Sequence, residues 1–83
     1  MKIYYKVIHF FITKQAEHFH YFNIGMYDSK EKALDVVKKL QVKEGFSLRP
    51  KKFYVYRVLR MHKPKLLNKT FWGDGFTTIY YNK

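Results

Sequence analysis

The chain contains no cysteine, which excludes disulfide bridges and every zinc site built on thiolates. Proline, glycine and carboxylate side chains are also few, at two, four and six in 83 residues. No apolar run approaches the roughly 18 residues that a membrane-spanning helix needs. The apolar N-terminal run is interrupted by Lys6 and His9, and no small-residue cleavage site of a signal peptide follows it. These absences predict one cytoplasmic domain over residues 1–83, with no membrane partner and no cofactor.

Positive charge is the property in which the chain departs most from an ordinary small domain. Its 17 Lys and Arg side chains stand against six Asp and Glu, which gives a net charge of +11. Small soluble domains usually carry a net charge of about 2–8 in magnitude. Because like charges at this density repel one another, the excess favours a binding role toward nucleic acid, another polyanion or an acidic protein. A compositional origin, in which Lys, Tyr and Asn follow the base composition of a genome, is the alternative.

Aromatic and β-branched residues concentrate in three stretches that predict strands, residues 2–12, 19–27 and 52–60. The polar residues 13–18 predict the turn that joins the first two into a hairpin. Gly25 lies inside the second stretch, where glycine indicates a bulge or a close approach of another backbone.

A helix is predicted after the second strand. Asp28 followed by Glu31 has the spacing of a capping box, and the helix is expected to run to about Lys43 or Glu44. Gly45 would end it in the left-handed conformation that glycine adopts freely. The apolar positions recur at helical spacing and predict a buried stripe of Ala33, Val36, Val37 and Leu40.

The rest of the chain predicts a loop over residues 62–69, a turn over 72–76 and an optional short strand over 77–81. The element order is then ββαβ, or ββαββ if the last strand forms. We expect an α+β fold, a small antiparallel sheet of three or four strands with one helix packed on one face. The crossover through the helix should place the third strand beside the first.

Four short segments carry a further pattern, at residues 24–33, 45–46, 53–55 and 72–76. The first contains G-x-Y-x-S-x-E-x-A at the passage from strand to helix, and the last reads W-x-x-G-F. Together they resemble a small family of uncharacterised bacterial proteins. The resemblance implies the fold and no activity, and the family members are acidic where this chain is basic.

Cations and aromatic rings alternate along the outer faces of the first and third strands. If the Ile3/Val7 and Phe53/Val55 sets face the core, the outer residues lie side by side on the open face of the sheet. They are Lys2, Tyr4, Lys6, Lys52, Tyr54, Tyr56 and Arg60. Rings on a sheet stack on bases while Lys and Arg bind phosphates, so this face predicts a nucleic-acid site. Tyrosine is also a good strand former, so a homodimer interface, a protein-interaction face or a plain solvated sheet are the alternatives.

A second basic surface is predicted on the helix flank, from Lys32, Lys39 and Lys43. It would extend for roughly 16 Å, at about 1.5 Å per residue. Asp35 precedes Lys39 by four residues, so an ordinary solvated flank with a local ion pair is the alternative. Lysines at 63, 65 and 69 add a third patch in the loop.

Histidine is the remaining residue type that could bind a metal or act as an acid or base. His18 and His20 stand two residues apart, but two ligands do not hold a structural zinc, so no metal site is predicted. His9, His18, His20 and His62 are the groups that a small toxin-like ribonuclease would use as acid and base. Their spacing has no recognisable arrangement, so no catalytic residue is assigned, and an enzyme is the less favoured alternative to a binding module.

Overall fold

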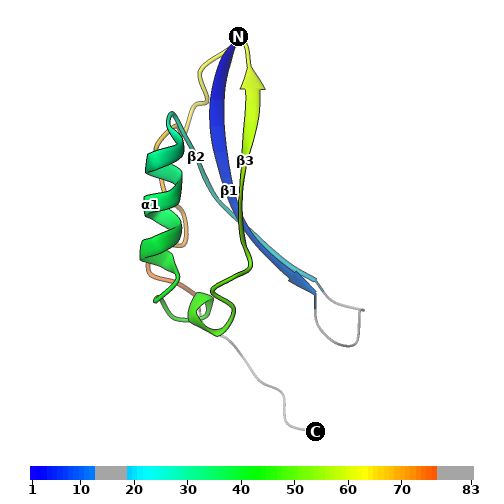
Figure 1. Cartoon of the computed structure of the whole chain (residues 1–83), viewed down its shortest axis with the longest axis vertical. Coiled ribbons are helices and arrows are strands. Elements are labelled where there is room, and N and C mark those ends of the chain that lie inside the picture. The colour runs from blue at the N-terminus through cyan, green and yellow to red at the C-terminus, as the bar shows by residue number, and fades with distance from the viewer. Residues whose placement is uncertain (13–18, 77–83) are drawn as a thin grey trace, which may run out of the picture.

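A three-stranded antiparallel sheet carries one helix on one of its faces (Figure 1). The computed structural model describes residues 1–12 and 19–76. Its elements are β1 (Lys2–Ile12), β2 (Phe19–Tyr27), α1 (Lys30–Leu40), the short 3₁₀ helix η1 (Phe46–Leu48) and β3 (Phe53–Arg60). The strand order β2-β1-β3 confirms the predicted α+β fold, with the third strand beside the first.

The predicted strand limits agree closely with the structure. The limits of β1 and β2 are those predicted, and β3 begins one residue later, at Phe53. Lys52 lies just outside the strand, where its carbonyl accepts a hydrogen bond from the Phe10 N–H at 3.0 Å. The predicted turn over 13–18 and the optional strand over 77–81 lie outside the described residues.

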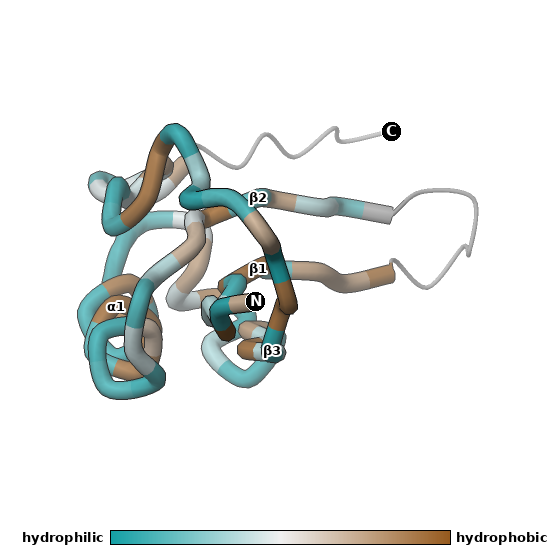
Figure 2. The backbone as a smooth tube through the Cα atoms, turned by 90° about the horizontal axis from the view of Figure 1, so that it is seen from above, coloured by the Kyte–Doolittle hydropathy of each residue, from teal (hydrophilic) through white to brown (hydrophobic). Residues whose placement is uncertain are grey.

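The core lies between the sheet and the helix, which form two layers when the molecule is seen from above (Figure 2). Strand alternation turns Val7, His9 and Phe11 of β1 inward, and all three are buried. The stripe predicted on α1 packs against them: Ala33 and Leu40 are buried, and Val36 and Val37 are partly buried against the same cluster. Further buried side chains come from the other elements: Ile24, Tyr27 and Phe46.

A bulge in β2 decides which of its side chains enter this core. Val7 pairs with Gly25 while the next residue, Ile8, pairs with Asn23, so Ile24 has no partner across the ladder. The extra residue reverses the alternation, because a shift of one position exchanges the two faces of a strand. Ile24 and Tyr27 are therefore both buried although they are three residues apart. This confirms the irregularity that the glycine in the second stretch predicted.

The helix begins and ends differently from its prediction. Its N-cap is Ser29, whose hydroxyl accepts a hydrogen bond from the Lys32 backbone N–H at 3.2 Å. The predicted capping box of Asp28 and Glu31 is wrong, because the Asp28 carboxylate is held by Lys32 and Asn68 instead. The helix ends at Leu40, three or four residues early, where the chain tightens into a turn.

Gly45 has the left-handed backbone that was predicted, with φ of 83°, but it precedes η1 instead of closing α1. Its surroundings explain the residue type: a Cβ there would lie 2.8 Å from the Phe76 ring and would collide with the Phe76 carbonyl. The Phe76 N–H donates to the Glu44 carbonyl at 2.9 Å. The chain around Phe76 therefore docks on the turn between α1 and η1.

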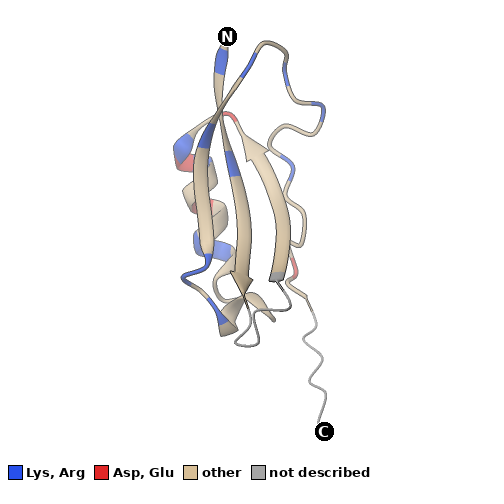
Figure 3. Ribbon diagram, turned by 90° about the vertical axis from the view of Figure 1, so that its right-hand side faces the viewer, with Lys and Arg blue, Asp and Glu red and all other residues tan. Residues whose placement is uncertain are grey.

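Residues 61–71, which we call the return segment, follow β3 and run to the outer edge of β2 (Figure 3). Leu67 forms a parallel bridge with Met26. The Asn68 N–H donates to the Met26 carbonyl and the Phe71 N–H to the Ile24 carbonyl, each at 2.8 Å. The segment is irregular, as predicted, yet its backbone is fixed to the sheet.

Candidate functional site

Four of the cations and tyrosines predicted on the outer faces of the first and third strands lie opposite one another in the sheet. Lys6 pairs with Tyr56 and Lys2 with Arg60 across the β1–β3 ladder. Ile8 pairs with Tyr54 two positions further along the same ladder, next to the Lys6–Tyr56 pair. This surface, on the side of the sheet away from α1, is called the open face below. Neither β1 nor β3 contains a carboxylate.

The tyrosines of the open face differ in accessibility. Tyr54 and Tyr56 are 45% and 42% exposed, so each offers part of its ring to a ligand. Tyr4 is 4% exposed, although it lies on the same side of β1. It lines a cavity together with Leu67 of the return segment, which covers this end of the sheet. Tyr4 therefore contributes to packing and leaves no ring surface for a base, which its alternation alone did not reveal.

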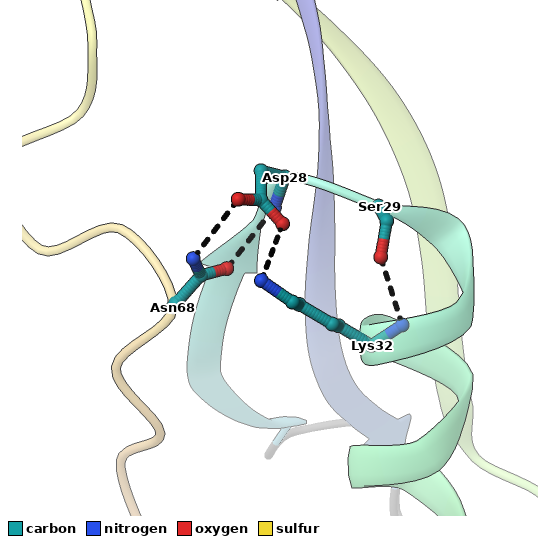
Figure 4. A network of polar contacts seen from close by, with 4 residues as sticks. All are labelled: Asp28, Ser29, Lys32 and Asn68. Atoms are coloured by element: carbon teal, nitrogen blue, oxygen red, sulfur yellow. Dashed lines mark hydrogen bonds and ion pairs between the residues drawn. The ribbon is translucent and has the colours of Figure 1, made fainter.

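The helix flank is largely neutralised by local ion pairs. Lys39 lies 3.2 Å from Asp35, and Lys32 lies 2.9 Å from Asp28. Figure 4 shows that Asp28 also meets Asn68, and these two neighbours hold the pKa of the Asp28 carboxyl below its usual range. Lys43 lies beyond the end of α1, so it does not extend the stripe. Two of the three lysines predicted as a second basic surface are therefore in local ion pairs, and the third lies outside the helix.

A cavity of about 510 Å³ lies between the open face and the return segment. Its lining combines four Lys or Arg side chains, a histidine, an asparagine and apolar groups, and it includes no carboxylate. The polar side chains are Lys6, Arg60, Lys63 and Lys65 with His62 and Asn23. Met26, Pro64, Leu66 and Phe71 supply most of the apolar wall. Its size falls in the range of small-ligand sites, about 300–1,000 Å³.

The wall formed by the return segment is held by side chains as well as by backbone bonds. Asn68 accepts from the Asp28 N–H and donates to the Asp28 carboxylate, both at 3.1 Å. Tyr27 and Thr70 share a hydrogen bond of 2.7 Å between their hydroxyls. Burial of Tyr27 raises the pKa of its phenol, which keeps the group neutral. The cavity therefore has a fixed wall before any ligand arrives.

The described histidines lie apart from one another. His9 is buried in the core, where its Nε2–H donates to the Arg49 carbonyl at 2.9 Å, and burial lowers its pKa. His20 pairs with Phe11 at the far end of β1, and their rings stack 4.6 Å apart. His62 lines the cavity beyond the opposite end of the sheet. The described residues therefore offer no paired histidine acid and base, and no group of three His, Asp or Glu among them could hold a metal ion.

Among the cavity-lining residues that sequence reasoning missed are Asn23 and Phe71. Neither belongs to a periodic pattern, since the bulge separates Asn23 from its neighbours and the return segment has no regular structure. A usable signal was present in composition, because the chain from residue 53 to residue 73 contains five Lys or Arg and no Asp or Glu.

Comparison with protein-family models, curated proteins and solved structures found no match to the chain. The resemblance to a bacterial family therefore stays a prediction. Among the described residues, no helix combines the length and the apolar character needed to cross a membrane.

Proposed function

We propose that this domain binds single-stranded nucleic acid through the open face, mainly electrostatically and with little sequence preference. The observation that carries the proposal is the pairing of Lys6 with Tyr56 beside Tyr54, on strands without carboxylates. Bases stack on exposed rings while neighbouring cations meet the phosphates, which is how sheet surfaces commonly hold unpaired strands. The lack of cysteine fits a reducing compartment such as the cytoplasm, where nucleic acids are present.

The opposition of Lys2 and Arg60 supports a polyanionic ligand. Like charges directly opposite each other on two strands destabilise a sheet. Two described carboxylates, Asp28 and Asp35, are engaged in ion pairs with Lys32 and Lys39. A phosphate near the two opposed cations would relieve their repulsion, which a solvated sheet without a ligand would not do.

Titration of a labelled single-stranded oligonucleotide of about ten nucleotides tests the proposal, a length within the range of about 4–16 that a sheet-based fold covers. Binding should be tightest at about 50 mM salt and weaken steeply as salt rises, because phosphate contacts release counterions. Absence of binding at low salt would contradict the proposal.

Two matched pairs of variants locate the surface. Replacing both Tyr54 and Tyr56 with alanine should weaken binding about tenfold or more, since stacking contributes roughly 1–3 kcal/mol per base, whereas phenylalanine at both positions should retain it. Arg60→Ala should weaken binding more than Lys38→Ala, which removes the same charge from an exposed position on α1. Equal losses from Arg60→Ala and Lys38→Ala would show that net charge alone attracts the ligand.

A homodimer through the same tyrosines is the competing use of this face. Light scattering separates the two: a dimer that persists at high salt and is lost with the two alanines would assign the face to self-association.

A further inference from the structure

We infer that the cavity between the open face and the return segment binds the phosphorylated terminal nucleotide of a nucleic-acid strand. The inference rests on the proposed function and adds a definite ligand, a phosphomonoester attached to a base-bearing sugar. It assigns the cavity a role separate from that of the tyrosines.

The charge of the lining favours a phosphomonoester over an internal phosphodiester. Lys6, Arg60, Lys63 and Lys65 all line one open cavity, and its lining contains no carboxylate. A phosphomonoester carries a charge of about −1.5 to −2 at neutral pH and offers three acceptor oxygens, whereas an internal phosphodiester carries a single charge. Four cations around one space are therefore better complemented by a chain end.

The apolar part of the lining suits a nucleotide better than a free inorganic ion. Phe71 is 39% exposed and lines the cavity, and its backbone N–H is fixed to β2 at 2.8 Å. A ring held in this way can stack on a base at little entropic cost. Inorganic phosphate has no apolar group that could contact the ring of Phe71.

Lys6 connects the cavity to the rest of the proposed interface. It lines the cavity, and on the open face it pairs with Tyr56. A strand whose terminal nucleotide occupies the cavity can therefore continue over Tyr56 toward Tyr54 without leaving the basic surface. This continuity gives the strand a defined starting point.

The test compares one oligonucleotide in three forms, with a 5′-phosphate, with a 3′-phosphate and with two hydroxyl ends. A hydroxyl-ended oligonucleotide two nucleotides longer serves as the control for added charge. One phosphorylated form should bind about tenfold more tightly than both hydroxyl-ended forms, as expected for a charged hydrogen-bonded contact. Equal affinity of a phosphorylated form and the longer control would overturn the inference while leaving the proposed function intact. Failure of all four to bind would overturn both.

A double replacement of Lys63 and Lys65 with alanine should abolish the preference for the phosphorylated end. Both residues are exposed in the return segment and precede its bonds to β2, so the fold does not depend on their charges. Alanine at Lys38 and Lys43 removes the same charge on the side of α1 and should lower all affinities while keeping the preference. If the preference survives in the Lys63 and Lys65 variant, the cavity is not the site.

Free 5′-AMP should displace the phosphorylated oligonucleotide from the protein better than ribose 5-phosphate or inorganic phosphate does. Equal displacement by all three would contradict stacking of the base on Phe71.

Discussion

His9 is the one ionisable side chain of β1 that the fold buries completely. Phe46 and Phe53 pack edge-on against its ring, with centroids 4.8 and 4.6 Å away. Nε2 donates to the Arg49 carbonyl, while Nδ1 is buried and has no hydrogen-bond partner among the described residues. These surroundings therefore favour the neutral imidazole over the protonated one, since a buried charge is unstable without a partner.

Acid should destabilise the protein through His9. Burial lowers its pKa in the folded state below the ordinary value of 6.5, so the unfolded state binds the proton more readily. The neutral ring contributes its full share to the free energy of unfolding above the pKa that His9 has in the unfolded state. That share is lost as pH falls from this value toward the lower pKa of His9 in the folded state. The free energy of unfolding, measured with urea, should fall by up to about 1.4 kcal/mol per pH unit in this window.

The variants His9→Phe and His62→Ala test whether the loss of stability in acid comes from His9 or from an exposed histidine. Phenylalanine keeps a planar aromatic ring and cannot titrate, so the slope of stability against pH below about 6.5 should flatten. His62 is exposed, and its replacement should leave the slope unchanged. A slope that persists without the imidazole of His9 would place the titrating group elsewhere.

Among the elements, the return segment depends on the smallest residue of β2. A Cβ on Gly25 would lie 2.8 Å from the Tyr27 hydroxyl and would collide with the Lys69 backbone carbonyl. The collision involves backbone on both sides, so no side-chain rotation relieves it. The bonds from Asn68 and Phe71 to the edge of β2 therefore require glycine at this position.

Gly25→Ala should lower the free energy of unfolding by about 1–3 kcal/mol, the usual cost of overpacking. Hydrogen exchange at the Asn68 and Phe71 amides should accelerate more than at the amides that join β1 to β3, because the segment is displaced from β2 first. Gly73→Ala is the matched control: nothing lies within 4 Å of the added Cβ, and stability should change by less than about 0.5 kcal/mol. Similar losses in the two variants would show that steric approach at Gly25 is not the cause.

The elements themselves were largely predictable, because strands and helix follow local patterns. The alternation of β1, the aromatic content of β2 and the spacing of Ala33 and Leu40 are each read within one element. The choice of Ser29 over Asp28 as N-cap was not predictable, since both residue types cap helices well. It is decided by Asn68, a residue 40 positions away along the chain that binds Asp28.

At the scale of the whole molecule, positive charge is distributed unevenly. The two ion pairs among the described residues both lie near α1, whereas β1, β3 and the return segment have cations without acidic residues of their own. Repulsion within this surface destabilises the folded state, and salt screens it over a distance of about 10 Å at 0.1 M.

The melting temperature should therefore rise as sodium chloride increases from about 20 mM to about 300 mM, because screening weakens repulsion between exposed cations. Circular dichroism measures the effect. Replacing Lys63 and Lys65 with glutamate should reduce the rise, since the variant starts with less repulsion on this surface. A melting temperature independent of salt would contradict this prediction. It would indicate that the cations are too far apart for their repulsion to destabilise the folded state.

The candidate site was predictable only in part, for reasons of geometry. Period-two alternation placed Tyr54, Tyr56 and Lys6 on one surface, and the ladder brings them together. It could not reveal that Tyr4 is covered or that a cavity forms, because both depend on where the return segment crosses the sheet. That path is decided by bonds of long sequence separation, such as the one between Tyr27 and Thr70.

The anchoring of the return segment has a consequence for the order in which the parts of this fold form during synthesis. Its last backbone bond to β2 comes from Phe71, and the cavity needs that residue in its wall. The N-terminal hairpin can pair as soon as it is made, but contacts distant in sequence form late because the intervening chain must first be ordered. A ribosome must therefore release the chain through Phe71 before the cavity can form, so a product truncated before that residue retains some cationic strand surface and lacks this wall of the cavity.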